Sequence, residues 1–246
     1  MAKKERIDKL LVERGLAETR TRAQALVLAG AVVAGEARVD KPGQLVDPDL
    51  PLRLKGEALR YVSRGGLKLE GALVHFGLAV AGLDALDVGA STGGFTDCLL
   101  QRGAARVIAL DVGYGQLHPR LRADARVVVR ERVNARALTR EEVPFDVDLV
   151  VVDVSFISLR KVLPAALAFL KPQGALLALV KPQFEVGKGE VGKGGVVRDE
   201  GKRREAIEGI AAFAREQGLA VAGWVDSSLA GPAGNLEALL YARKGA

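Results

Sequence analysis

The hydrophobic pattern of the first sixty residues predicts two short helices followed by short strands. Apolar residues recur at helical spacing over residues 5–15 and again over 18–30, and a glycine ends each run. The next residues predict a small hairpin around Gly35-Glu36, and prolines interrupt the strands after it. A core of this size stabilises a domain only weakly, so residues 1–60 are predicted to form a compact module that leans on a neighbour or a ligand.

From residue 67 onward, apolar runs alternate with amphipathic segments, which is typical of an α/β fold with a doubly wound parallel sheet. The runs are continuous, as expected for strands that helices cover on both faces. The predicted parallel strands lie near residues 83–88, 106–110, 126–129, 147–153 and 174–180. The predicted helices cover 67–77, 95–102 and 200–217, and a closing antiparallel pair of strands covers 219–225 and 237–243. Residues 61–66 are expected to link the module to this second domain, residues 67–246.

The composition restricts the classes of protein to consider. No run of 18 apolar residues occurs and the N-terminus lacks an apolar segment, so we expect neither a membrane span nor a secretory signal. The single cysteine, Cys98, excludes an internal disulfide and a cysteine-based zinc site, and we expect a cytoplasmic monomer without a bound metal. A net charge of +6 favours an anionic partner, nucleic acid before an anionic membrane, although a solvated basic surface is the alternative.

The most informative stretch runs from Leu86 to Asp97, where a predicted strand meets a helix through a glycine turn. Gly89, Gly93 and Gly94 let the backbone approach a ligand, and the first N–H groups of the helix face it. The spacing differs from the Gly-x-Gly-x-x-Gly of dinucleotide sites, which disfavours a nicotinamide cofactor. The stretch therefore predicts a nucleotide-type cradle of another kind, with a purely structural glycine turn as the alternative.

The stretch resembles the first motif of class I S-adenosylmethionine (SAM) methyltransferases, in which this loop wraps the methionine moiety. Asp111 ends the next predicted strand, where a carboxylate can accept both hydroxyls of the cofactor's ribose. We expect a side chain at Gly93 to occupy the path of the cofactor and to leave the fold largely intact. The residues predicted to bind the cofactor are Asp87, Gly89, Ala90, Ser91, Gly93, Gly94, Asp111, Asn134, Asp153 and Phe156.

The first domain resembles the alpha-L RNA-binding fold through two motifs. One is Arg6-x-Asp8-x-x-Leu-x-x-x-Gly15, and the other runs from Thr21 through Gly30 to Gly35. The hairpin departs mildly from the family pattern, because Val-Ala-Gly stands where Val-Asn-Gly is usual. The resemblance implies a basic face that meets RNA phosphates, although each arginine could equally belong to a solvated helix face. The predicted RNA-binding residues are Arg6, Lys9, Arg20 and Arg22, with Arg60 and Arg64 near the linker.

Over nearly its whole length the chain is similar to the TlyA family, in which an alpha-L module precedes an FtsJ-like ribose methyltransferase. The similarity rests on the segments SRGGLKLEGAL, LDVGASTGGFTD, LDVGYGQLH, VVDVSFISL, LVKPQFE and GNLEALLYAR. It implies SAM as cofactor, ribosomal RNA or ribosomal subunits as partner, and methylation of a cytidine 2′-hydroxyl. Some members are recorded as haemolysins.

The FtsJ relatives use a Lys-Asp-Lys-Glu tetrad, which by motif falls on Lys68, Asp153, Lys181 and Glu237. A 2′-hydroxyl keeps its proton at neutral pH, so the enzyme must position it and accept that proton. We assign Lys181 as the base or orienting group and Lys68 as the neighbouring cation that favours its neutral form. Asp153 is expected to position the lysines near the methyl group, and Glu237 to fix the ammonium groups or the ribose. Surface ion pairs are the alternative.

Other activities fit the sequence less well. Amino-group methylation usually shows Asn/Asp-Pro-Pro-Tyr/Phe where this chain has Asp153-Val-Ser-Phe156. Cytosine C5 methylation needs a cysteine near the fourth or fifth strand, whereas Cys98 lies on the helix predicted after the glycine turn, where a packed thiol is expected. A non-catalytic RNA-binding protein and a membrane-active haemolysin stay open as alternatives. Residues 181–198, which hold five glycines and four basic residues, are expected to form a basic flap over the RNA.

Overall fold

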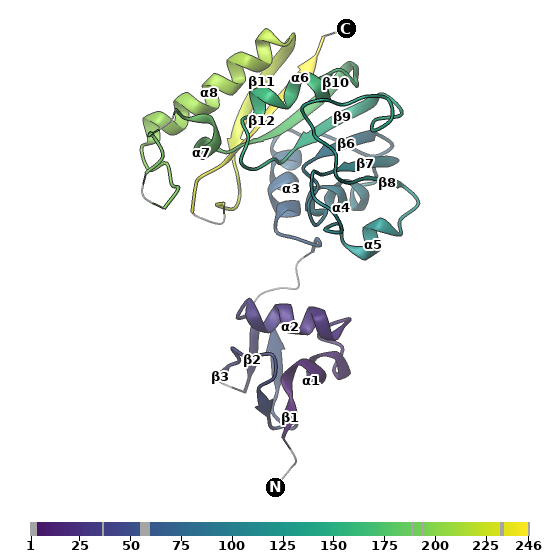
Figure 1. Cartoon of the computed structure of the whole chain (residues 1–246), viewed down its shortest axis with the longest axis vertical. Coiled ribbons are helices and arrows are strands. Elements are labelled where there is room, and N and C mark those ends of the chain that lie inside the picture. The colour runs from purple at the N-terminus through teal and green to yellow at the C-terminus, as the bar shows by residue number, and fades with distance from the viewer. Residues whose placement is uncertain are drawn as a thin grey trace. The chain divides into compact units, whose positions relative to one another are not determined.

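The structure is a computed structural model that describes residues 4–35, 37–54, 60–187, 189–192, 194–231 and 234–245. The chain divides into two compact units, residues 1–60 and residues 61–246 (Figure 1). Each unit has its own apolar core and is described here by itself.

The first unit packs two helices on short strands. Helices α1 (Ile7–Glu13) and α2 (Arg20–Leu28) bury Ile7, Leu11, Ala23 and Val27 in its core. Its strands are β1 (Glu5–Arg6), β2 (Val32–Ala34), β3 (Ala37–Arg38), β4 (Leu45–Val46) and β5 (Leu52–Leu54). Strand β2 lies between β3 and β5, and β1 pairs with β4.

Two details of the first unit differ from the sequence prediction or refine it. The first helix begins at Ile7 rather than at residue 5, because Glu5 and Arg6 pair in antiparallel register with Val46 and Leu45. The predicted hairpin is confirmed by the pairing of β2 with β3, and Gly35 has the positive φ of +62° that such a turn favours. Glu36 lies outside the described residues.

The second unit is built on a seven-stranded sheet with the order β11-β12-β10-β9-β6-β7-β8. Its strands are β6 (Asp84–Val88), β7 (Arg106–Leu110), β8 (Val127–Arg130), β9 (Val147–Val152), β10 (Leu170–Val180), β11 (Leu219–Asp226) and β12 (Ala238–Lys244). Strands β6 to β10 are parallel to one another, and β12 pairs antiparallel with both β10 and β11. The predicted doubly wound sheet with a closing antiparallel pair is confirmed.

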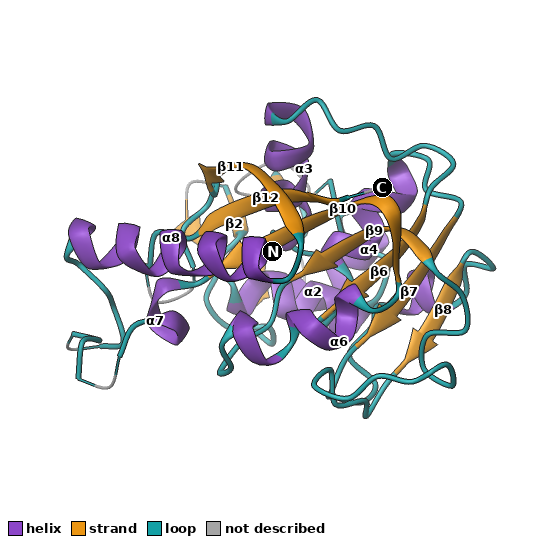
Figure 2. Ribbon diagram, turned by 90° about the horizontal axis from the view of Figure 1, so that it is seen from above, coloured by secondary structure: helices purple, strands orange, loops and turns teal. Residues whose placement is uncertain are grey.

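Helices cover both faces of this sheet because its strands are apolar on both sides. Along β9, Leu149 and Val151 pack in the cluster of α3 (Gly65–His75) and α4 (Gly94–Gln101), whereas Val150 and Val152 pack on the opposite side. The second side is covered by α6 (Leu163–Leu167) and α8 (Glu200–Glu216) (Figure 2). Three short helices complete the unit: α5 (Pro119–Arg122), η1 (Leu159–Lys161) and α7 (Pro182–Glu185).

The segment expected to be a linker, residues 61–66, packs as part of the second unit. Tyr61 is 2% exposed and lies in the cluster of α3 and α4. The backbone N–H of Val62 donates to the carboxylate of Asp97 in α4 at 2.8 Å. Helix α3 begins at Gly65, two residues before the predicted start, because Gly65 and Gly66 pack closely against α4 and Tyr61.

Candidate active site

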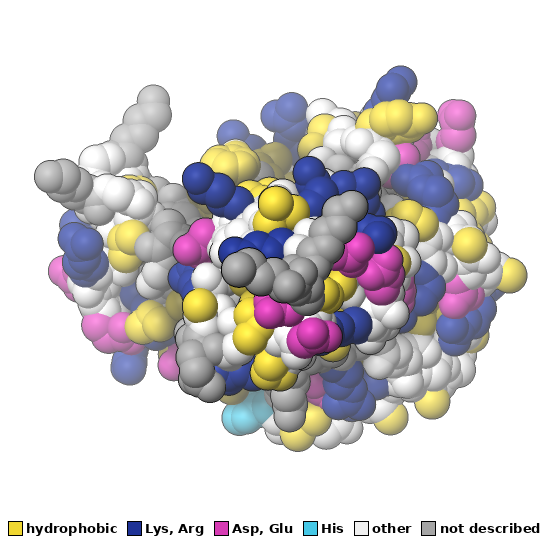
Figure 3. Space-filling view, turned by 90° about the horizontal axis from the view of Figure 1, so that it is seen from below, with side chains coloured by type: hydrophobic (Ala, Val, Ile, Leu, Met, Phe, Trp, Pro, Cys, Tyr) yellow, Lys and Arg dark blue, Asp and Glu magenta, His cyan; other side chains and the backbone are white. Residues whose placement is uncertain are grey.

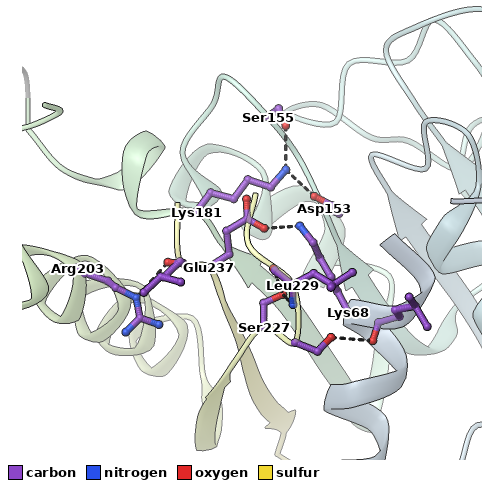
Figure 4. Close-up of polar contacts among 11 residues, drawn as sticks. Lys68, Asp153, Ser155, Lys181, Arg203, Ser227, Leu229 and Glu237 are labelled. Carbon is purple, nitrogen blue, oxygen red and sulfur yellow. Dashed lines mark hydrogen bonds and ion pairs between the residues drawn. The ribbon is translucent and has the colours of Figure 1, made fainter. Parts of the chain in front are cut away.

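The sheet register gathers the four tetrad residues at one edge. Asp153 follows β9 and Lys181 follows β10, so both lie at the carboxyl edge of the parallel strands. Glu237 precedes β12, which runs antiparallel, and Val180 pairs with Ala238, so Glu237 reaches the same edge. Lys68 comes from α3, which packs beside the sheet, and Figure 4 shows the four side chains converging.

The four side chains form two separate ion pairs. Lys68 Nζ lies 2.5 Å from Glu237 Oε2, and Lys181 Nζ lies 2.6 Å from Asp153 Oδ1. Glu237 is 1% exposed, whereas the Asp153 side chain is 24% exposed. The sequence predicts that Asp153 positions both lysines, but in the structure Asp153 contacts Lys181 and Glu237 contacts Lys68. The two lysine side chains are equally exposed, at 11%, so the pairs differ mainly in the exposure of their carboxylates.

Lys181 has a second partner that sequence reasoning missed. Its Nζ donates a hydrogen bond to Ser155 Oγ at 2.8 Å (Figure 4). Ser155 stands two residues after Asp153, and the next residue, Phe156, has a positive φ of +64°. The direction of the Ser155 side chain depends on this turn, which the sequence does not reveal. The only signal in the sequence is that Ser155 lies inside the segment VVDVSFISL.

Two adjoining cavities open at this edge. The smaller, about 310 Å³, is lined by the tetrad, Arg64 and the glycine turn, including Gly89, Ala90, Ser91 and Gly94. The larger, about 1000 Å³, is lined by Asp111, Asn134 and Phe156 among others. Both are lined by Gly89, Ser91, Asp153 and Ser155, so a ligand that spans the two passes the Lys181 ion pair.

Asp111 has a fixed orientation at the larger cavity. Its Oδ2 accepts from the N–H of Ser91 at 2.8 Å, and its Oδ1 accepts from the N–H of Gly113 at 2.7 Å. A carboxylate has room for further donors on both oxygens, such as two neighbouring hydroxyls. Phe156 is 91% exposed, and its ring centroid lies 5.3 Å from that of Phe184 at the rim of the same cavity.

Asp87 lies behind the cavities rather than on their walls. It is fully buried, and its Oδ2 accepts from Thr96 Oγ1 at 2.7 Å. Its Oδ1 has no hydrogen-bond partner among the described residues. Burial raises the pKa of this carboxyl group to about 7.

The glycine turn is constrained by the packing of the protein around it. Gly93 has a φ of +97°, and a side chain there would run into Leu117 and Leu121 rather than into a cavity. The expected reason for Gly93, an open path for the cofactor, is therefore wrong. Gly89 has a φ of +88°, and a side chain there would meet the backbone carbonyl of Asp153. Gly89 thus lets β6 and the residue after β9 approach closely at the site.

Two further residues that sequence reasoning missed hold the chain around Glu237. Asn235 is 1% exposed, accepts from the N–H of Val197 at 2.9 Å and donates to the carbonyl of Gly195 at 2.8 Å. Arg203 is 4% exposed and donates to the carbonyl of Leu236 at 3.1 Å. The expected flap, residues 181–198, is thereby anchored at its end and begins with α7. Its residues Lys188 and Lys193 lie outside the described residues.

The predicted RNA-binding arginines of the first unit are partly engaged within the protein. Arg6 donates to Asp8 twice, at 3.0 and 2.9 Å, and Arg20 donates to Asp8 at 3.0 Å. Asp8 is fully buried, and its hydrogen bond from Arg6 is the largest of the contacts that hold its pKa well below the usual range. The side chains of Arg6 and Arg20 are still 46% and 58% exposed.

The other predicted RNA-binding residues are all exposed to solvent, but their surroundings differ. Lys9 lies 3.2 Å from both Glu5 and Glu13, which is typical of a solvated helix face. Arg22, Arg60 and Arg64 are exposed, and Arg64 lines the smaller cavity. Figure 3 shows basic side chains on the surface with acidic ones among them.

Three further features of the described part of the chain concern metal ligands, membrane-spanning helices and the cysteine. No group of three His, Cys, Asp or Glu side chains within the described ranges could hold a metal ion. Among the helices that the structure describes, none is long and apolar enough to cross a membrane. Cys98 is fully buried, and burial raises the pKa of its thiol to about 11, as expected for a packed side chain.

Comparisons with known proteins agree with this arrangement. The FtsJ-like methyltransferase model matches residues 61–244, and the S4 domain model matches residues 5–50. The 16S/23S rRNA (cytidine-2′-O)-methyltransferase TlyA of Mycobacterium tuberculosis is 50% identical over 99% of this chain and 91% of its own. Hemolysin A of Brachyspira hyodysenteriae is 40% identical over 96% of this chain and 98% of its own.

A solved structure agrees as well. A Streptococcus thermophilus protein named as a hemolysin is 45% identical, with a TM-score of 0.77, and the match covers 100% of this chain and 90% of that one. The resemblance inferred from the motifs is thus confirmed by near full-length matches. The chain belongs to the TlyA family, with an S4 domain followed by an FtsJ-like methyltransferase domain.

Proposed function

We propose that this protein transfers the methyl group of SAM to the 2′-hydroxyl of a cytidine in ribosomal RNA. The observation that carries the proposal is the ion pair of Lys181 and Asp153 at the junction of the two cavities. A ribose hydroxyl needs a positioned proton acceptor, and a lysine at this junction meets the substrate where it meets the cofactor. The name of the TlyA relative states the same reaction for that protein.

The residues around the cavities fit a nucleoside-bearing cofactor. The larger cavity has room for the nucleoside, and the oriented carboxylate of Asp111 offers acceptors for its ribose hydroxyls. Gly89, Ala90 and Ser91 bring backbone to the wall of the smaller cavity, where the methionine portion would lie. When bound, SAM supplies a methyl group that its sulfonium already activates, so the protein needs no further electrophile.

The tetrad then has a simple division of work. Lys181, in its neutral form, accepts the proton of the 2′-hydroxyl as the oxygen attacks the methyl group. Asp153 holds the amine at that place. The pair of Lys68 and Glu237 lines the same cavity and orients the approaching ribose.

Recognition of RNA is proposed for both units. The first unit matches the S4 domain model, and its resemblance to the alpha-L fold implies RNA binding. Arg6, Arg20 and Arg22 expose positive charge on this unit. Arg64, at the smaller cavity, would meet a phosphate beside the target ribose. If ribosomal subunits are the substrate, the protein acts in the cytoplasm, where the subunits are.

The proposal is tested by incubating the protein with methyl-labelled SAM and each purified ribosomal subunit. We expect label in one or both subunits, and mass spectrometry of the digested RNA should show a 2′-O-methylated cytidine. Label on a base nitrogen or carbon would refute the ribose assignment. No transfer to either subunit, together with RNA binding, would favour a non-catalytic binding protein.

A further inference from the structure

Lys181 is held by an ion pair with Asp153 and by a hydrogen bond to Ser155. Its Nζ lies 2.6 Å from Asp153 Oδ1 and 2.8 Å from Ser155 Oγ, and both partners stand on the segment that follows β9. Lys68, the other lysine of the site, has Glu237 as its partner. Ser155 lines both cavities, so its hydroxyl stands at the same junction as the amine.

Two contacts restrict the amine more than one contact does. The ion pair with Asp153 alone would let the amine turn about that contact. The hydrogen bond from Nζ to Ser155 Oγ adds a second restraint beside the space that the two cavities share. A neutral lysine amine has two N–H bonds and one lone pair in a tetrahedral arrangement, so restraining the amine also restrains its lone pair.

We propose that Ser155 is a positioning residue that aims the lone pair of Lys181 at the substrate hydroxyl. The inference rests on the proposed function for the identity of that hydroxyl. The proton passes from the 2′-hydroxyl to Lys181 Nζ, and Ser155 keeps its own proton throughout. Phe156 follows Ser155 with a φ of +64°, a conformation that a bulky residue rarely adopts, so this turn holds Ser155 at a defined place.

The effect on catalysis is measured with Ser155→Ala and Ser155→Thr in the full chain, using ribosomal subunits and labelled SAM. In the alanine variant the Lys181 amine should no longer be oriented toward the substrate hydroxyl. We therefore expect kcat to fall by about 10- to 100-fold, with KM for SAM unchanged. Threonine keeps the hydroxyl and should restore most of the rate. Equal losses in both variants, or a wild-type kcat in the alanine variant, would overturn the proposal.

A second measurement does not depend on methyl transfer. The rate at which an acetylating reagent modifies Lys181 is followed by mass spectrometry in the free full-length protein. Removing one hydrogen bond of ordinary strength in Ser155→Ala should raise this rate about fivefold. Ser158→Ala is the matched control, because its hydroxyl, in the same loop, donates to Glu185 instead, and Lys181 should react there at the wild-type rate.

The two measurements separate the possible failures. If Lys181 reacts at the same rate in Ser155→Ala as in the wild type, Ser155 does not hold the amine and the inference is wrong. If the wild-type protein methylates a base while Ser155→Ala still exposes Lys181, the proposed function fails and the positioning of Lys181 by Ser155 stands.

Discussion

The contact between Lys181 and Asp153 is where the proposed chemistry can be altered with least disturbance. Lys181→Arg keeps the positive charge and the ion pair, but a guanidinium cannot take a proton at usable pH. Methyl transfer should fall about a hundredfold or more, the loss expected for a general base. Calorimetry should show unchanged SAM affinity. Wild-type turnover in Lys181→Arg would mean that the residue serves only as a positive charge.

Asp87 gives a pH dependence whose sign follows from its burial. Its pKa is raised from 3.8 to about 7, so the neutral form stabilises the fold at low pH. That contribution is lost as pH rises from 3.8 to about 7, because the unfolded chain ionises this carboxyl group over that range while the folded chain keeps it neutral. Asp87→Asn removes the ionisation and can still accept from Thr96.

The free energy of unfolding in urea should therefore fall more in the wild type than in Asp87→Asn between pH 5 and pH 8. The expected difference is roughly 2 kcal/mol, from the size of the pKa shift. Parallel pH profiles for the two proteins would show that Asp87 ionises as readily in the folded as in the unfolded state.

Site residues that directly follow a predicted strand could be located from the sequence, because the end of the strand determines their position. Asp153 and Lys181 follow apolar runs, so their meeting at the sheet edge follows from topology. The partner of each lysine could not be predicted, because it depends on side-chain directions that the sequence does not encode locally. Ser155 and Asn235 were missed for this reason, and the engagement of Arg6 with the buried Asp8 was missed as well.

Among the structural elements, the glycine turn between β6 and α4 shows what a motif can and cannot predict. The turn and its neighbouring strand and helix were predicted at nearly their observed bounds, because continuous apolar runs and glycines define them. The roles of the separate glycines depend on which neighbours lie behind them. Leu117 and Leu121 come from a later segment, so the sequence around Gly93 gives no sign of their contact with it.

Gly93→Ala should therefore act on stability before it acts on the cofactor. The methyl group meets Leu117 and Leu121, and the φ of +97° strains any residue with a side chain. We expect the free energy of unfolding to drop by about 1–3 kcal/mol in denaturant titrations. An unchanged midpoint combined with lost SAM binding would restore the cofactor-path explanation.

On the scale of the whole molecule, we expect the first unit to contribute RNA recognition and the second unit to carry out methyl transfer. The second unit holds both cavities, the tetrad and two apolar clusters of its own, so it should fold without residues 1–60. The shortened protein should bind SAM like the full chain in calorimetry and should lose methylation of ribosomal subunits. Full activity of the shortened protein would show that the first unit contributes neither affinity nor register.

The central claim is that the acceptor is a ribose hydroxyl, and one substrate tests it directly. Once the methylated nucleotide is mapped, an RNA or a reconstituted subunit is prepared with a 2′-deoxy nucleotide at that position. The wild-type protein should transfer no label to it while methylating the matched ribose substrate. Label on the deoxy substrate would contradict the account, since the methyl group would then lie on the base.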